Sequence, residues 1–286
     1  MALKPVTEEF IDELKLGLSP EAVLDVPDDY LSEPRSRWRG ISSVLVLPQN
    51  VNEVSAVVSL ANARTIPIIP YGGGTGLVGG QIQDKGPSGI LLSLERMNEI
   101  RSLNLDENVI TVESGVILSN LRDAAEEAKR IFPLSLASEG TAQIGGNLAT
   151  NAGGVNVLRY GSTRNLCLGL EVVFADGSIW NGLSRLHKDN TGYDLKNLII
   201  GSEGTLGIIT AATMKLFPKP LEHTVALIAV ESPKDALRLL SETKDYFGET
   251  ISAFELINKM GIDFFNETKM EVKVPFSKIP EWMVLL

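Results

Sequence analysis

Alternating apolar and polar stretches in the first hundred residues predict a β-α-β unit. Short apolar runs at 43–48 and 66–69 are typical of buried strands. Between them, Asn50 and Glu53 stand in the N-cap and capping-box positions of a helix. The apolar side chains of this helix recur at helical spacing, at Val51, Val54, Val57, Val58 and Ala61. The second strand leads directly into a glycine-rich segment, residues 71–80.

The pattern continues with short elements as far as a pair of prolines. Further strands are predicted at 89–94, 109–113 and 169–175, a hairpin turn at Asp176–Gly177, and helices at 7–16 and 117–130. Pro218 and Pro220 then mark a boundary. We therefore expect an α+β chain with a first domain at 1–220, made of two α/β subdomains at about 40–100 and 101–220.

Residues 221–286 are predicted to begin a second, smaller domain. Strands at 224–230 and 251–257 flank a helix at 232–247, which makes one more β-α-β unit. No closing element is apparent in 270–286, and about 66 residues are few for a domain of comfortable size. We interpret this part as incomplete, in a chain that is a fragment or is truncated at its C-terminus.

Composition narrows the classes of function. The formal net charge of −10 disfavours a nucleic-acid partner or an anionic membrane surface. No apolar run approaches the ~20 residues of a membrane span, and the acidic N-terminus predicts no secretory or transit signal. The single cysteine, Cys167, lies in an apolar run and is interpreted as a small core residue rather than a nucleophile. A reducing, cytoplasmic location is expected.

Three glycine-rich segments, at 72–80, 140–154 and 201–207, carry the candidate chemistry. The stretch 145–154 shows no apolar face and no lasting helical or strand period, and its glycines make it costly to order. Bare backbone amides suit a closely held anion such as a pyrophosphate. The alternative is a series of structural turns between core strands. Three segments converging on one ligand would suit a long dinucleotide lying between two small α/β subdomains.

One of these segments also matches a dinucleotide fingerprint. Residues 74–79 fit G-x-G-x-x-G, and Glu95 and Glu99 lie at a suitable distance for the acidic partner. The fingerprint requires the glycines to open a helix, whereas residues 80–89 are predicted to form a loop. We therefore expect no Rossmann site and retain only a backbone cradle for phosphate.

Residues 48–218 resemble the flavin-binding domain of the vanillyl-alcohol oxidase superfamily, also called the PCMH-type FAD-binding domain. The resemblance is carried by 145–154 with Arg159-Tyr160-Gly161, by 188–195 and by 201–210. It is strongest for the branch of D-2-hydroxyglutarate dehydrogenases, D-lactate dehydrogenases and glycolate oxidase subunits. It implies a PCMH-type domain of two α/β subdomains, followed here by the start of an α+β substrate, or cap, domain.

The resemblance also implies an FAD site made largely of backbone. The residues expected at the pyrophosphate are Pro70, Gly72, Gly73, Gly74, Thr75 and Gly76. The cradle would continue through Leu77, Gly140, Thr141, Gly145, Gly146, Ala149, Thr150, Gly153 and Gly154, with Tyr160 nearby. Gly204, Ile208 and Ile209 would present backbone to the adenosine side, and Glu203 would either cap a local turn or touch the cofactor. Some relatives tether FAD through a histidine in the first loop. Residues 71–80 contain none, so noncovalent FAD is predicted.

The chain departs from this branch in its histidines. The branch carries its catalytic and metal-binding histidines in a C-terminal region that has no counterpart in this sequence. His187 and His223 show no metal-ligand spacing and are interpreted as surface or structural residues. No metal site is predicted, and the catalytic base is unknown.

The resemblance implies an FAD-dependent dehydrogenase of D-2-hydroxy acids such as D-2-hydroxyglutarate, D-lactate or glycolate, with hydride passing from Cα to flavin N5. This chain would supply the FAD-binding part. The alternative is a noncatalytic flavin-binding or electron-transfer module, and a nicotinamide-dependent wall-precursor reductase of the same fold fits 188–210 less well. The expected partners are a small 2-hydroxy acid and an electron acceptor, either a quinone or an electron-transfer flavoprotein. A homodimer is left open.

Overall fold

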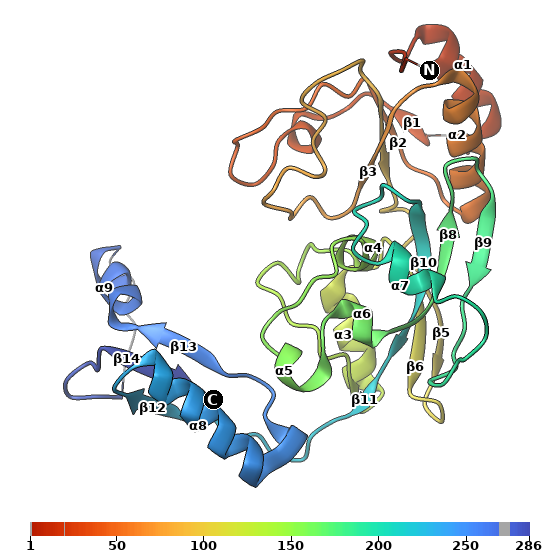
Figure 1. The fold of residues 1–286 in the computed structure, drawn as a ribbon. Coiled ribbons are helices and arrows are strands. Elements are labelled where there is room, and N and C mark those ends of the chain that lie inside the picture. Colours follow the sequence, from red (N-terminus) through yellow and green to blue (C-terminus); the bar gives the residue numbers. More distant parts are fainter. Residues whose placement is uncertain (1, 20, 269–274) are drawn as a thin grey trace. The chain divides into compact units, whose positions relative to one another are not determined.

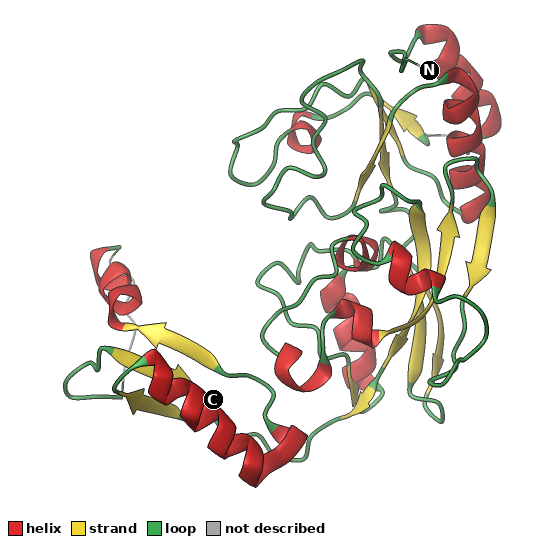
Figure 2. Cartoon of the chain, viewed as in Figure 1, coloured by secondary structure: helices red, strands yellow, loops and turns green. Residues whose placement is uncertain are grey.

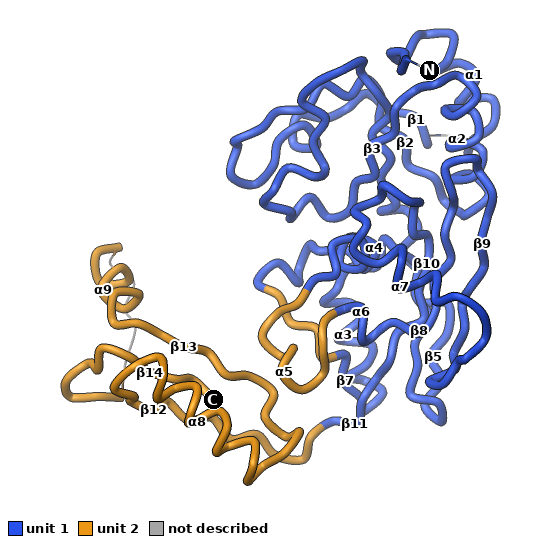
Figure 3. Tube along the Cα trace, viewed as in Figure 1, with its two compact units in different colours: residues 1–132, 137–152, 163–219 blue, residues 133–136, 153–162, 220–286 orange. Residues whose placement is uncertain are grey.

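The computed structural model describes residues 2–19, 21–268 and 275–286, which fall into two compact units (Figure 3). Unit 1 comprises residues 1–132, 137–152 and 163–219, and unit 2 comprises 133–136, 153–162 and 220–286. Helices and strands occur in both units, which gives the α+β class that the sequence predicts (Figure 2).

The first sheet of unit 1 contains the predicted β-α-β unit. Its order is β1-β2-β4-β3, with β2 (Val44–Val46) and β3 (Ile68–Tyr71) both parallel to β4 (Ile90–Ser93). Helix α2 (Val51–Arg64) connects β2 with β3, and its cap is Asn50, whose side chain accepts the Glu53 N–H at 3.0 Å. The remaining elements of this region are α1 (Glu8–Gly17), β1 (Val23–Leu24) and the 3₁₀ turn η1 (Asp28–Leu31). The apolar face of α2 is buried against the sheet, as its spacing predicts.

The second sheet of unit 1 is antiparallel and has five strands (Figure 1). In spatial order these are β5 (Ile100–Asn104), β6 (Val109–Glu113), β10 (Ile208–Lys215), β8 (Cys167–Val173) and β9 (Ile179–Gly182). The helices of this part are α3 (Leu118–Glu127), α4 (Ile144–Ala149), α6 (Thr163–Leu166) and α7 (Leu195–Ile199). The predicted helix 117–130 ends at Glu127, because Arg130–Ile131 form strand β7, which pairs with β11 (Phe217–Pro218).

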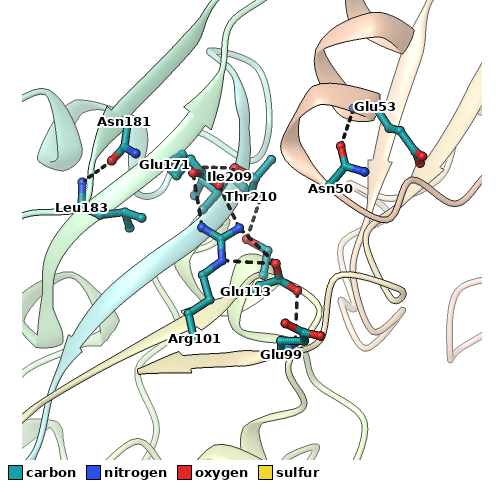
Figure 4. Close-up of polar contacts among 11 residues, drawn as sticks. Asn50, Glu53, Glu99, Arg101, Glu113, Glu171, Asn181, Leu183, Ile209 and Thr210 are labelled. Atoms are coloured by element: carbon teal, nitrogen blue, oxygen red, sulfur yellow. Dashed lines mark hydrogen bonds and ion pairs between the residues drawn. The ribbon is translucent and has the colours of Figure 1, made fainter. Parts of the chain in front are cut away.

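Edge strand β5 was not predicted, and an ion-pair network ties it to the sheet (Figure 4). Arg101 Nη2 lies 3.0 Å from Glu113 Oε1 on β6 and 3.2 Å from Glu171 Oε1 on β8. The Thr210 hydroxyl donates to the same Glu171 oxygen at 2.9 Å. Both carboxylates are buried, so the guanidinium compensates charge that the sheet has removed from water.

Unit 2 contains a third strand, which the sequence analysis also missed. Strands β12 (Leu227–Val230) and β13 (Glu255–Asn258) flank helix α8 (Pro233–Phe247), which confirms the β-α-β interpretation with both strands shorter than predicted. Strand β14 (Trp282–Leu285) lies between them and pairs antiparallel with both. The absence of a closing element was therefore a wrong prediction: a four-residue apolar strand supplies it. The other elements are α5 (Val157–Tyr160), the turn η2 (Gly248–Thr250) and α9 (Lys259–Glu267).

Cys167 lies in the core, as predicted, and should be chemically inert in the native protein. Its thiol donates to the Gly169 carbonyl at 3.3 Å, and its side chain is buried in β8. Burial raises the pKa of the Cys167 thiol to about 12, and the thiolate is the reactive form. We expect no reaction with Ellman's reagent at pH 8 in the folded protein and one thiol equivalent after denaturation. Rapid labelling of the native protein would contradict this placement.

Candidate functional site

The first glycine segment is a loop whose backbone donors have no protein partner. Residues 72–89 join the parallel strands β3 and β4 without a helix, which confirms that the fingerprint at 74–79 is not a Rossmann turn. Within the described residues, no carbonyl or side chain accepts a hydrogen bond from the backbone N–H groups of residues 73–80. Residues 72–76 are nevertheless half-buried. Because buried amides normally find acceptors, this loop is suited to an external anion.

The second glycine segment lies directly against this loop. A Cβ added to Gly73 would stand 2.0 Å from the Thr141 carbonyl oxygen, and one added to Gly72 would stand 3.4 Å from Gly146 Cα. Gly145 and Gly146 lie in α4, so the prediction that this stretch has no helical period was wrong for its first part. Ile144 and Leu148, four residues apart, are fully buried and supply the short apolar face that the glycines obscured.

The third glycine segment joins the other two. The Gly201 N–H donates to the Leu148 carbonyl at 3.0 Å, and the Glu203 N–H donates to the Ala149 carbonyl at 2.9 Å. A Cβ on Gly204 would stand 2.8 Å from Pro70 Cγ, at the start of the first loop. The segments 72–80, 140–152 and 201–207 thus meet within unit 1, as one ligand site requires.

The predicted glycines differ in what a side chain would meet at each position. At Gly73, Gly145 and Gly204 an added Cβ would strike the protein itself; for Gly145 the obstacle is Ser114 Cβ at 2.7 Å. At Gly140 nothing lies within 4 Å, and at Gly146 the nearest atom is Gly72 Cα at 4.0 Å. An added Cβ would meet nothing at Gly140 and would make only an ordinary van der Waals contact at Gly146. Protein packing therefore accounts for glycine at the first three positions but not at these two.

The remaining predicted residues differ in their freedom to contact a ligand. Thr150 is exposed and Ala149 half-buried at the end of α4, next to the third segment. Ile209 is committed to the sheet, because its side chain is buried and its carbonyl accepts the Ser114 hydroxyl at 2.6 Å. Gly153, Gly154 and Tyr160 belong to unit 2, where the Arg159 guanidinium lies 4.9 Å from the Tyr160 ring centre.

A small cavity opens beside the third segment. It has a volume of about 220 Å³ and is lined by Pro70, Gly204, Thr205 and Ile208 together with apolar residues of α2 and β3. Ligand pockets that enclose a whole drug-sized molecule span roughly 300–1,000 Å³. The cavity is thus suited to one ring system of a larger ligand rather than to the whole of it.

Two tyrosines, Tyr30 and Tyr71, pack against each other next to the first glycine loop, where the Tyr71 hydroxyl lies beside Gly74. The Tyr30 hydroxyl on η1 donates to Glu95, and its ring lies 4.9 Å from that of Tyr71. Burial, and then the Glu95 carboxylate, raise the pKa of both Tyr30 and Tyr71. Both hydroxyls therefore stay protonated at neutral pH and are not available as bases. Glu95 was considered as a dinucleotide partner but serves this tyrosine instead.

The described residues fit a dinucleotide in two further ways. Asn147 Oδ1 on α4 and Ser202 Oγ in the third segment are buried without a hydrogen-bond partner among the described groups. Such orphaned polar atoms are rare and point to an absent partner. The Ser202 hydroxyl and the free amides of 73–80 can donate to a phosphate, whereas Asn147 Oδ1 can only accept and would need a ligand donor such as a hydroxyl group. Sequence reasoning missed Asn147, because within a glycine-rich run it looked like turn chemistry.

Candidate catalytic groups are sparse in the part of the chain that the structure describes. There, no cluster of three or more His, Cys, Asp or Glu side chains is arranged to hold a metal ion. His187 is exposed and its Nε2 lies 3.2 Å from the Glu107 carbonyl oxygen, and His223 is also exposed. Among the described helices, none combines the length and apolarity needed to cross a bilayer.

Comparison with known proteins agrees with this geometry. Residues 42–182 match the FAD binding domain family. The zebrafish (Danio rerio) protein "D-2-hydroxyglutarate dehydrogenase, mitochondrial" is 38% identical over 286 residues, which cover 98% of this chain and 52% of that protein. A putative mitochondrial D-lactate dehydrogenase of Schizosaccharomyces pombe is 38% identical over 253 residues, 86% of this chain and 47% of that protein.

A solved structure confirms the fold class. Substrate-bound p-cresol methylhydroxylase superposes with a TM-score of 0.73 at 20% identity, covering 99% of this chain and 62% of that one. The fold and loops thus define a PCMH-type FAD-binding domain of the α+β class. The chain is similar to the FAD-binding half of D-2-hydroxyglutarate and D-lactate dehydrogenases, and it spans about half the length of the curated relatives it matches.

Proposed function

We propose that this chain binds FAD noncovalently and serves an FAD-dependent dehydrogenase of D-2-hydroxy acids such as D-2-hydroxyglutarate or D-lactate. The observation that carries the proposal is the run of unpaired amides at 73–80, in a loop that packs against Gly146. Bound FAD would supply the acceptor for the Cα hydride of the substrate. The residues of this chain would hold its diphosphate by backbone donors and one ring in the cavity beside Gly204.

The chemistry of the loops explains why this arrangement would suit a flavin dinucleotide. Amide donors neutralise an anion without bringing a lysine or arginine into the site, so they add no charge when the ligand is absent. The half-buried position of residues 72–76 strengthens each amide–phosphate contact by excluding water. The small 2-hydroxy acid, the quinone or electron-transfer flavoprotein acceptor and the cytoplasmic location belong to the same proposal.

The test is an anaerobic titration of the purified chain with FAD, followed by D-2-hydroxyglutarate, D-lactate or glycolate. Loss of the flavin band near 450 nm would support a dehydrogenase active within this chain. A bound flavin that does not respond to any of the three acids would favour the alternative of a noncatalytic flavin-binding or electron-transfer module. Failure to bind FAD at all would overturn the proposal.

Noncovalent attachment gives a separate prediction. The loop 71–80, where some relatives carry a tethering histidine, holds no histidine. Precipitation of the FAD-loaded protein with trichloroacetic acid should therefore leave all flavin absorbance in the supernatant. A yellow pellet, or flavin fluorescence on a denaturing gel, would contradict this mode of binding.

A further inference from the structure

We propose that Gln81 is a positioning residue for the first glycine loop, which turns the Thr75 and Leu77 amides toward the bound anion. This inference rests on the proposed function and adds to it the residue that orients the donors. Gln81 is half-buried and follows the glycine run directly. It was not singled out by its sequence, because a lone glutamine in a polar loop carries no motif.

The side-chain carboxamide of Gln81 holds two carbonyl groups of the loop. Its Nε2 donates to the Gly76 carbonyl at 2.9 Å and to the Gly74 carbonyl at 3.4 Å. In a planar trans peptide, the C=O of one residue and the N–H of the next point in opposite directions. The described peptides are all trans. Fixing these two carbonyls toward Gln81 therefore directs the N–H groups of Thr75 and Leu77 away from it.

Those two amides are free to meet a ligand. Across the described chain, no group accepts a hydrogen bond from the N–H of Thr75 or Leu77. The next amide after Gln81, that of Ile82, is already used, since it donates to the Gly79 carbonyl at 3.0 Å. The loop thus separates its polar groups: carbonyls face the glutamine, and donors face outward.

A device of this kind is needed because the loop is rich in glycine. Glycine permits both signs of φ, so the peptides on either side of Gly74 and Gly76 can rotate at low cost. A rotated peptide would present its carbonyl oxygen, rather than its N–H, to a phosphate, and the two would repel. Gly74 already sits at φ +68°. Two hydrogen bonds from one side chain would disfavour the rotated state.

The chain offers a matched control in Gln83. Its Nε2 donates to the Pro87 carbonyl at 2.6 Å and its Oε1 accepts the Gly89 N–H at 3.0 Å, so it also ties down a loop with two bonds. These bonds lie outside the glycine run. Gln81→Met and Gln83→Met remove the same chemistry at the same side-chain length, and both should lower the unfolding temperature to a similar extent.

The experiment measures dissociation constants for FAD and for ADP by calorimetry on the wild type and both variants. We expect Gln81→Met to weaken both ligands about tenfold, and Gln83→Met to change either by less than twofold. If the wild type binds FAD and Gln81→Met binds it equally well, the inference fails while the proposed function stands. If the wild type binds neither ligand, the proposed function fails, and the inference with it.

A second measurement keeps the inference testable should Gln81→Met not fold. In ¹⁵N-labelled wild type, saturation with ADP should move the amide protons of Thr75 and Leu77 downfield, because each gains a phosphate acceptor. The Ile82 amide, which keeps its carbonyl partner, should move little. ADP binding that leaves the Thr75 and Leu77 resonances in place would overturn the inference.

Discussion

Replacing Gly146 with valine should abolish flavin binding while leaving the protein folded. A Cβ at this position would make only an ordinary van der Waals contact, with Gly72 Cα at 4.0 Å, so it does not itself clash with the protein. The same side chain would project between the first and second glycine segments, where the cofactor is proposed to lie. We expect FAD affinity to fall at least about 100-fold, equivalent to about 2.7 kcal/mol of binding free energy. Flavin fluorescence quenching measures it, with circular dichroism to confirm folding.

The neighbouring glycine provides the control. Gly145→Val makes the same change one residue earlier, but its Cβ would stand 2.7 Å from Ser114 Cβ inside the protein. Overpacking of this kind costs about 1–3 kcal/mol of stability. Gly145→Val should therefore lower the unfolding midpoint, whereas Gly146→Val should change affinity. A Gly146→Val protein that purifies yellow would show that the cofactor lies elsewhere.

Three wholly buried strands, β4, β6 and β8, could be predicted from the sequence, whereas the exposed edge strand β5 and the short central strand β14 could not. β4, β6 and β8 are runs of fully buried residues, so their apolar sequences show the element directly. β5 is mostly exposed and is held by Arg101, whose partners lie 12 and 70 residues further along the chain. β14 has only four residues, and it forms a strand because it pairs with β12 and β13 on either side. Such long-range pairing leaves no local pattern.

The position of the candidate site was predictable, but the reason for each of its glycines was not. Three glycine segments indicated where the backbone must be bare, and the structure brings 72–80, 140–152 and 201–207 into contact within unit 1, while Gly153 and Gly154 fall in unit 2. The sequence could not distinguish Gly73, where an added Cβ would strike the Thr141 carbonyl, from Gly146, where it would make only an ordinary contact with Gly72. That distinction depends on contacts between segments some 70 residues apart. It decides which substitutions should change ligand affinity and which should change the stability of the fold.

Arg101→Met should strongly destabilise unit 1 while leaving the glycine segments intact. The guanidinium Nη2 lies 3.0 Å from Glu113 and 3.2 Å from Glu171, whose side chains are 11% and 6% exposed (Figure 4). Removing one partner of a buried ion pair leaves uncompensated charge and costs about 3–5 kcal/mol. Urea unfolding monitored by tryptophan fluorescence would measure the loss.

Two further sets of variants test whether the loss of stability comes from the buried carboxylates rather than from removing any arginine. Arg185→Met breaks an exposed pair with Glu107, and its effect should stay within about 1 kcal/mol. Adding Glu113→Gln and Glu171→Gln to Arg101→Met should recover part of the stability, because neutral amides are cheaper to bury than unpaired carboxylates. An Arg101→Met protein no less stable than Arg185→Met would mean that water already screens the two carboxylates. The edge strand would then be held by its backbone ladder to β6 alone.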